Sequence, residues 1–232
     1  MPGRVEPSER SVQISPSGIT GDLTIPVNAR GVVIFAHGTG SSRLSSRNRF
    51  VASVLWKSRL TTLLLDLLTA EEEQIDLRTR HLRFDINLLA ERLIQATNWL
   101  AGDSQTGSSP VAYFGASTGA AAALIAAAQV SQPIYAVVSR GGRPDLAGAA
   151  LQKVKAPTLL IVGGDDHAVI ELNKTALQAL QCEKKLEIIP GATHLFEEPG
   201  ALERVARLAG EWFQNHLSTP SQTGRAAFSP PA

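Results

Sequence analysis

The segment Gly115-Ala116-Ser117-Thr118-Gly119 has the pattern G-x-S-x-G, with one serine between two glycines. It follows the apolar run 111–114 and precedes the alanine-rich stretch 120–128. A strand, a sharp turn and a helix in this order form a nucleophile elbow, which exposes a serine hydroxyl at the carboxyl end of a strand. The glycines are needed because side chains there would collide as the backbone doubles back. This context favours Ser117 as a nucleophile over a plain loop serine.

A serine hydroxyl attacks a carbonyl only when a neighbouring base removes its proton. In strand–helix folds of this kind the chain order is serine, acid, histidine, so the base follows the elbow. Three histidines do so: His167, His194 and His216. His194 lies in a loop directly after the apolar run 186–189, whereas His216 continues a helical spacing. The position after a strand predicts His194 as the base.

The base needs a carboxylate that fixes its tautomer and stabilises the imidazolium. Residues 161–164 form an apolar run that ends in two glycines, and Asp165 and Asp166 follow at once. One of two adjacent acids can instead form an Asx turn or cap the next helix. The predicted acid is Asp166, with Asp165 as second choice. Asp145, at the start of another helix, is a less favoured substitute.

Attack on a carbonyl also needs N–H donors for the developing oxyanion. One expected donor is the backbone N–H of Thr118, directly after the nucleophile, and the second should come from the loop after an early strand. That loop reads His37-Gly38-Thr39-Gly40, and its glycines allow close approach to a ligand. The N–H of Thr39 is the predicted second donor, and His37 is expected to buttress the loop by hydrogen bonding.

The elements that must position these residues follow from short apolar runs that alternate with amphipathic stretches. An opening hairpin is expected from residues 12–14 and 23–25. The further predicted strands are 31–35, 61–65, 111–114, 134–138, 158–162 and 186–189. The predicted helices include 49–59, a long helix over 82–100, and 201–217. This alternation predicts an α/β fold with a mostly parallel sheet covered on both faces, and residues 69–80 are expected to be a solvated loop.

Length and composition limit the remaining possibilities. The 232 residues suit one domain, and 44% hydrophobic with 19% charged residues is typical of a globular protein. A net charge of +1 gives no basic field for nucleic acid. We expect residues 1–10 to be a flexible N-terminus, residues 11–217 to form the catalytic domain and residues 218–232 to be a disordered tail.

No targeting or membrane signal is apparent in the sequence. Residues 1–10 lack the apolar core of a secretory signal, and no apolar run reaches membrane-spanning length. A cytoplasmic location is therefore expected. Cys182 is the single cysteine, which excludes an internal disulfide and a cysteine-rich metal site. Neither a metal nor an organic cofactor is expected.

With these motifs the chain resembles an α/β-hydrolase, and within that fold the cap-less, dienelactone-hydrolase-like group. The resemblance covers roughly residues 10–217. It implies an eight-stranded, mostly parallel sheet without a cap domain and a triad of Ser117, Asp166 and His194. The chain departs from dienelactone hydrolases proper at one position, because they carry a cysteine nucleophile where this chain has Ser117. A thiolate and an alkoxide differ in ionisation and leaving ability, so the family name does not carry over a substrate.

The function expected from these residues is a serine hydrolase of small to medium carboxylic esters or thioesters, whose partner is a small-molecule ester. One alternative is a non-catalytic binding protein on the same fold, although no triad member is missing. A cofactor-free acyltransferase or haloperoxidase would use the same triad. Arg43 and Arg140 follow strands at the expected site edge and are candidates for binding a substrate carboxylate or phosphate, or are simply surface or salt-bridge arginines.

Overall fold

We describe residues 7–217 from a computed structural model of the chain. Sixteen elements follow one another in this part. The strands are β1 (Ser8–Ile14), β2 (Ile19–Ile25), β3 (Val32–Ala36), β4 (Thr61–Leu65), β5 (Val111–Ala116), β6 (Ile134–Arg140), β7 (Thr158–Gly163) and β8 (Lys184–Ile189). The helices are α1 (Ser46–Lys57), α2 (Ala70–Thr79), η1 (Leu82–Phe84), α3 (Ile86–Gly102), α4 (Thr118–Gln129), η2 (Pro144–Lys153), α5 (His167–Ala179) and α6 (Ala201–His216).

All eight strands form one sheet in the order β1-β2-β4-β3-β5-β6-β7-β8. β1 pairs antiparallel with β2, and β2 antiparallel with β4, whereas the pairs from β4 through β8 are parallel. The predicted α/β fold with an eight-stranded, mostly parallel sheet is therefore confirmed. Parallel strands end at a common edge, so the loops after β3, β5, β6, β7 and β8 converge there.

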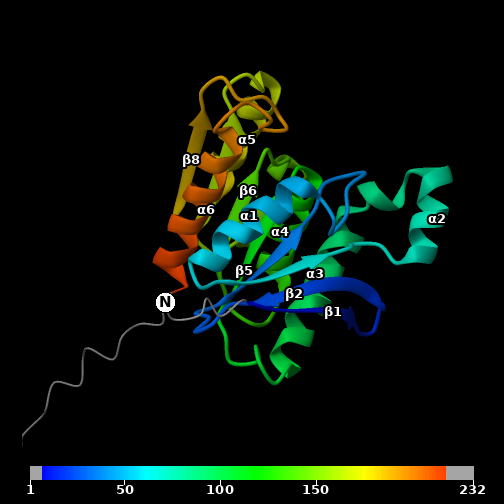
Figure 1. Ribbon diagram of the computed structural model, residues 1–232. Coiled ribbons are helices and arrows are strands. Elements are labelled where there is room, and N and C mark those ends of the chain that lie inside the picture. Colours follow the sequence, from blue (N-terminus) through cyan, green and yellow to red (C-terminus); the bar gives the residue numbers. More distant parts are fainter. Residues whose placement is uncertain (1–6, 218–232) are drawn as a thin grey trace, which may run out of the picture.

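Helices cover both faces of the sheet, as Figure 1 shows with α1 and α6 side by side on one face. Val51 and Leu55 of α1 pack with Val205 and Phe213 of α6 in one apolar cluster. On the opposite face α3 and α4 contribute to a second cluster, which also includes residues of η2 and α5. Residues 118–126 of α4 are all buried. Their small side chains let this helix lie close behind the elbow.

The segment after β4 corrects the sequence-based expectation of a solvated loop over residues 69–80. It contains α2, whose first turn has a capping box: the Thr69 hydroxyl accepts the N–H of Glu72, and the Glu72 carboxylate accepts that of Thr69. The three glutamates of residues 71–73 lie in the first turn, where the helix dipole favours negative charge. We call α2 and η1 together the arm, and in Figure 1 α2 projects away from the sheet.

Several boundaries also differ from the predictions by a few residues. The long helix α3 begins at Ile86 rather than Leu82, because Asp85 caps it by accepting the N–H of Leu88. Helix α1 begins at Ser46, three residues early, after a Ser45 cap. Residues 8–10, assigned to a flexible N-terminus, belong to β1, which pairs along its full length with β2. The tail predicted for residues 218–232 lies outside the described residues.

Residues 7–217 contain no separate cap domain, since every element outside the arm belongs to the sheet or to a helix covering it. Among the helices of this part of the chain, none combines the length and hydrophobicity that crossing a bilayer requires.

The elbow requires glycine because backbone packs directly on backbone there. A Cβ at Gly115 would lie 2.7 Å from both the nitrogen of Ala120 and the carbonyl oxygen of Gly119. We expect Gly115→Ala to lower the free energy of unfolding by about 1–3 kcal/mol or more, because backbone atoms cannot yield as a side chain would. Urea denaturation measures this difference.

Gly102, the last residue of α3, provides the matched control because a Cβ there would meet nothing within 4 Å. Gly102→Ala should be neutral or stabilise by up to about 1 kcal/mol, since alanine favours the helix. Equal effects of the two substitutions would contradict this account of the elbow.

Candidate active site

Ser117 occupies the turn between β5 and α4 with φ 51° and ψ −121°. This region is sparsely populated for residues with a side chain and costs about 1–3 kcal/mol. Surrounding hydrogen bonds hold the conformation. The Ser117 N–H donates to the carbonyl of Arg140 at 3.2 Å, and its own carbonyl accepts N–H groups from Arg143 at 3.0 Å and Ala120 at 3.1 Å. The predicted nucleophile therefore has the backbone geometry of an elbow.

The structure brings His194 and Asp166 together. His194 Nδ1 lies 2.7 Å from Asp166 Oδ2, across 28 residues of sequence. Asp166 follows the turn after β7, and the His194 loop follows β8. The two loops meet closely because a Cβ at Gly163 would lie 2.6 Å from the carbonyl oxygen of Thr193. An Nδ1–H that donates to a carboxylate leaves Nε2 free to accept a proton.

The two alternative acids have other surroundings. The side chain of Asp165 is exposed, and its backbone N–H donates to the carbonyl of Ala192 at 3.0 Å. Asp145 forms a two-pronged ion pair with Arg143, at 2.9 Å to Nε and 2.8 Å to Nη2. Of the three acids considered from the sequence, Asp166 is the one that contacts His194.

His194 lies over the end of β6, beside the elbow. A Cβ at Gly141 would be 3.6 Å from His194 Cε1, and the preceding residue, Arg140, accepts the N–H of Ser117. Among the hydrogen bonds formed within residues 7–217, none joins Ser117 Oγ to His194. In enzymes without substrate, such bonds are often long and tighten in the complex.

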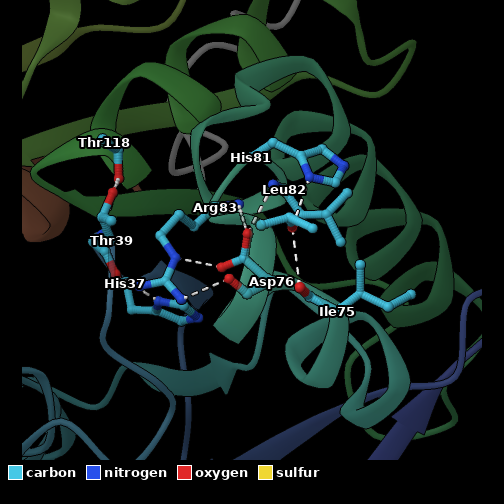
Figure 2. Close-up of polar contacts among 10 residues, drawn as sticks. His37, Thr39, Ile75, Asp76, His81, Leu82, Arg83 and Thr118 are labelled. Carbon is cyan, nitrogen blue, oxygen red and sulfur yellow. Dashed lines mark hydrogen bonds and ion pairs between the residues drawn. The ribbon is translucent and has the colours of Figure 1, made fainter.

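Thr39 and Thr118, the predicted oxyanion donors, lie together. The Thr39 N–H donates to Thr118 Oγ1 at 3.0 Å, and the two hydroxyl oxygens are 2.9 Å apart (Figure 2). The loop that carries Thr39 approaches the nucleophile closely, since a Cβ at Gly38 would lie 2.9 Å from Ser117 Cβ. Thr118 is the first residue of α4, where backbone N–H groups lack helical partners. The Thr39–Thr118 side-chain contact was not foreseen, because nothing in a separation of 79 residues signals it.

His37 buttresses the Thr39 loop, as predicted. Its Nδ1–H donates to the Gly38 carbonyl at 2.9 Å, so Nε2 accepts the N–H of Leu67 at 3.1 Å. Burial lowers the pKa of His37, although the Gly38 carbonyl and the charges of Asp66 and Glu73 act in the opposite direction. The ring is therefore held neutral in a structural position.

A pocket lies beside this loop and was missed from the sequence because the arm was expected to be a loop. Its lining comes from residues 37–42, residues 66–68, Leu89 and the arm residues Glu73, Asp76 and Arg83. Figure 2 shows the Arg83 side chain extending from the arm toward Thr39 and His37. Asp76 of α2 joins the two helices of the arm. Its carboxylate accepts the N–H groups of Leu82 and Arg83 in η1 and pairs with the Arg83 guanidinium. Burial alone would raise the pKa of Asp76, but its bonds with Arg83 outweigh this and lower it.

The two arginines predicted to bind substrate differ. Arg43 is neutralised within the protein: its Nη1 lies 2.5 Å from Asp66 Oδ2, and its Nε lies 3.3 Å from Asp22 Oδ1. These contacts fit the salt-bridge role that the sequence left open as the alternative for Arg43, and its substrate-binding role stays a prediction. Arg140 is buried beside the elbow, and its Nε has no hydrogen-bond partner.

Residues 21–219 match the sequence profile of the dienelactone hydrolase family. The chain belongs to this family. It is also similar to the crystal structure of a dienelactone hydrolase from Anabaena variabilis, with 60% identity, a TM-score of 0.88 and coverage of 91% of this chain and 99% of that one.

This dienelactone hydrolase family member is also similar to a solved structure of low sequence identity and to a longer protein of high identity. Est1E from Butyrivibrio proteoclasticus shares the fold, with a TM-score of 0.72 at 16% identity over 89% of this chain and 98% of that one. A Mycobacterium tuberculosis protein provisionally named phosphoribosyl transferase is 57% identical over 216 residues, which are 93% of this chain. The chain spans 48% of that relative, about half its length.

The environment of His37 predicts a pH dependence of stability. In an unfolded chain the pKa of histidine is about 6.5, and in the fold it is lower. The unfolded state therefore takes up the proton first, so the free energy of unfolding should decrease as pH falls below about 6.5. Urea denaturation between pH 8 and pH 5 measures this slope.

His37→Gln should flatten the slope, because an amide oxygen can accept the Leu67 N–H without titrating. His81→Gln is the matched control, since His81 is exposed on the arm. If His37→Gln leaves the slope between pH 7 and pH 5 unchanged, His37 is not responsible for it.

Proposed function

We propose that this protein is a serine hydrolase that cleaves small to medium carboxylic esters or thioesters through an acyl-enzyme. The observation that carries the proposal is the 2.7 Å contact between His194 and Asp166 at the sheet edge where Ser117 is held in a strained turn. Membership of a hydrolase family supports the same reaction class.

In the proposed first half-reaction Ser117 Oγ attacks the acyl carbon, and His194 Nε2 takes the hydroxyl proton. The Asp166 carboxylate accepts the hydrogen bond from Nδ1–H and stabilises the imidazolium. The N–H groups of Thr39 and Thr118 stabilise the tetrahedral oxyanion, for which Thr39 must exchange its bond to the Thr118 hydroxyl.

Collapse of the tetrahedral intermediate breaks the bond to the leaving group, and the His194 imidazolium protonates the departing alcohol or thiol. His194 then takes a proton from water, which attacks the acyl-enzyme carbonyl. Collapse of the second intermediate returns the proton to Ser117 Oγ and releases the carboxylic acid. These steps use protein groups and water alone.

The names of the relatives do not define the substrate. Dienelactone hydrolase is the name of the Anabaena variabilis protein. The serine at position 117, where dienelactone hydrolases proper carry a cysteine, argues for another ester as the substrate of this chain. The provisional name phosphoribosyl transferase belongs to a protein about twice the length of this chain. We propose that the half matched here contributes hydrolysis.

Ser117→Ala tests the nucleophile. A fluorophosphonate probe should label the wild-type protein and not this variant, and kcat for p-nitrophenyl butyrate should fall by about 10⁴-fold or more. The matched control is Ser108→Ala, at an exposed loop serine, which should label and turn over like wild type. A wild type that neither labels nor hydrolyses esters or thioesters would favour a non-catalytic binding protein instead.

Asp166→Asn tests the acid. An amide in place of the carboxylate should stabilise the wrong tautomer of His194 and lower kcat by about 10⁴-fold, with KM little changed. Asp165→Asn, one residue away on an exposed side chain, should retain nearly full activity. The opposite ranking of the two variants in steady-state assays would assign the acid to Asp165.

A further inference from the structure

Arg140 adjoins the elbow without belonging to the proposed triad. It is the last residue of β6, and its carbonyl accepts the Ser117 N–H at 3.2 Å. Ala136 and Val138 of the same strand pack in the cluster formed with α1 and α6. Alternation along the strand therefore sends the Arg140 side chain to that face, at the carboxyl edge of the sheet.

The guanidinium of Arg140 is buried without an anionic partner. The residue is 7% exposed, its Nε has no hydrogen-bond partner, and no ion pair among residues 7–217 includes it. The guanidinium lies over the ring of Phe196, whose centroid is 5.9 Å from the guanidinium carbon. Burial and the like charge of Arg47 lower the pKa of Arg140 to about 10, which leaves it charged at neutral pH.

Two other arginines among residues 7–217 follow the usual rule that a buried or partly buried charge is paired. Arg92 is buried to the same degree, at 8% exposed, and its Nη2 lies 2.5 Å from Glu72 Oε1. Arg143, three residues after Arg140, binds Asp145 through two nitrogens. Folding alone therefore gives no reason for an uncompensated charge at Arg140, where an apolar side chain would pack at lower cost.

A second guanidinium acts in the same region. Arg47 lies in the first turn of α1, and its Nε is also buried without a partner. One Nη of Arg47 binds Glu197 at 3.0 Å, but that carboxylate is 63% exposed and contacts Arg47 rather than Arg140. The two arginines thus retain unused donors close to His194, since Glu197 and Phe196 both belong to the loop that carries it.

We propose that Arg140, assisted by Arg47, binds an anionic group of the substrate, a carboxylate or a phosphate, while the ester carbonyl lies at Ser117. The planar fork of a guanidinium matches the two oxygens of either group. The bound anion then pairs with the Arg140 guanidinium, which has no anionic side chain beside it within residues 7–217. The substrate class is then an ester with a negative charge a few bonds from the scissile carbonyl, an assignment that rests on the proposed hydrolase function.

Three p-nitrophenyl esters of comparable acyl length test this: the hemiglutarate (carboxylate), the 4-phosphonobutyrate (phosphonate, for phosphate) and the valerate (uncharged). Wild type should prefer at least one anionic ester. Arg140→Met should lower kcat/KM for that ester by about 10- to 100-fold, mainly through KM, as expected for lost hydrogen bonds to a charged group. The valerate should change by about 2-fold or less, and Arg140→Lys should recover part of the loss.

Arg143→Gln is the matched control. This arginine follows β6 by three residues, its side chain is already paired with Asp145, and the substitution keeps the backbone N–H that holds Ser117. This variant should keep the preference for the anionic ester. Thermal unfolding distinguishes this role from a structural one. Arg140→Met should unfold at the same or a higher temperature, because it removes an unpaired buried charge, whereas loss of a structural contact would lower that temperature. A lower unfolding temperature with equal loss on all three esters would overturn the proposal.

Binding without turnover separates the two proposals. Calorimetry with glutarate and with inorganic phosphate on Ser117→Ala should detect binding that the double variant Ser117→Ala/Arg140→Met has lost. Anion binding in a protein that hydrolyses no ester would refute the hydrolase and retain the anion site. Ester hydrolysis without any anion preference or anion binding would refute the site and retain the hydrolase.

Discussion

The carboxyl edge of the sheet depends on how closely separate backbone segments approach one another. Gly38, Gly119 and Gly163 have no room for a Cβ atom. At Gly38 it would collide with the side chain of Ser117, and at Gly119 and Gly163 with the backbone of another loop. A Cβ at Gly119 would lie 2.5 Å from the His37 carbonyl oxygen, so α4 starts directly against the Thr39 loop. The nucleophile turn, the Thr39 loop and the His194 loop are therefore set by main-chain packing, which holds their side chains within reach of one another.

The same edge concentrates features that stability alone would not favour. Ser117 adopts a strained conformation, and Arg140 keeps a buried charge without a partner. The two features are adjacent, since the Arg140 carbonyl is one of the groups that hold Ser117 in place. Natural proteins tolerate such local costs mainly where a ligand or a reaction makes use of them. Away from this edge, apolar clusters cover both faces of the sheet, and the charge of the buried Arg92 is paired with Glu72.

The fold and the His194–Asp166 contact could be predicted because each depends on local signals in a fixed order. Alternating apolar runs define the strands, and glycine turns after successive strands place the site loops at one edge. The arm was mispredicted because its polar composition outweighed the capping box that begins at Thr69. The contact between Thr39 and Thr118 and the missing partner of Arg140 depend on side chains from distant segments, which spacing along the chain does not encode.

The arm stands apart from this main-chain framework. α2 packs chiefly on η1 rather than on the sheet, exposes Ile75 and Leu77, and is joined to η1 through the buried carboxylate of Asp76. One wall of the pocket is thus part of the core of the fold, and the other is the arm, which the ion pair of Glu72 with Arg92 ties to α3. Substitutions that keep this ion pair and the Asp76 contacts can therefore reshape the arm side of the pocket and leave unchanged the sheet edge at which the chemistry is proposed.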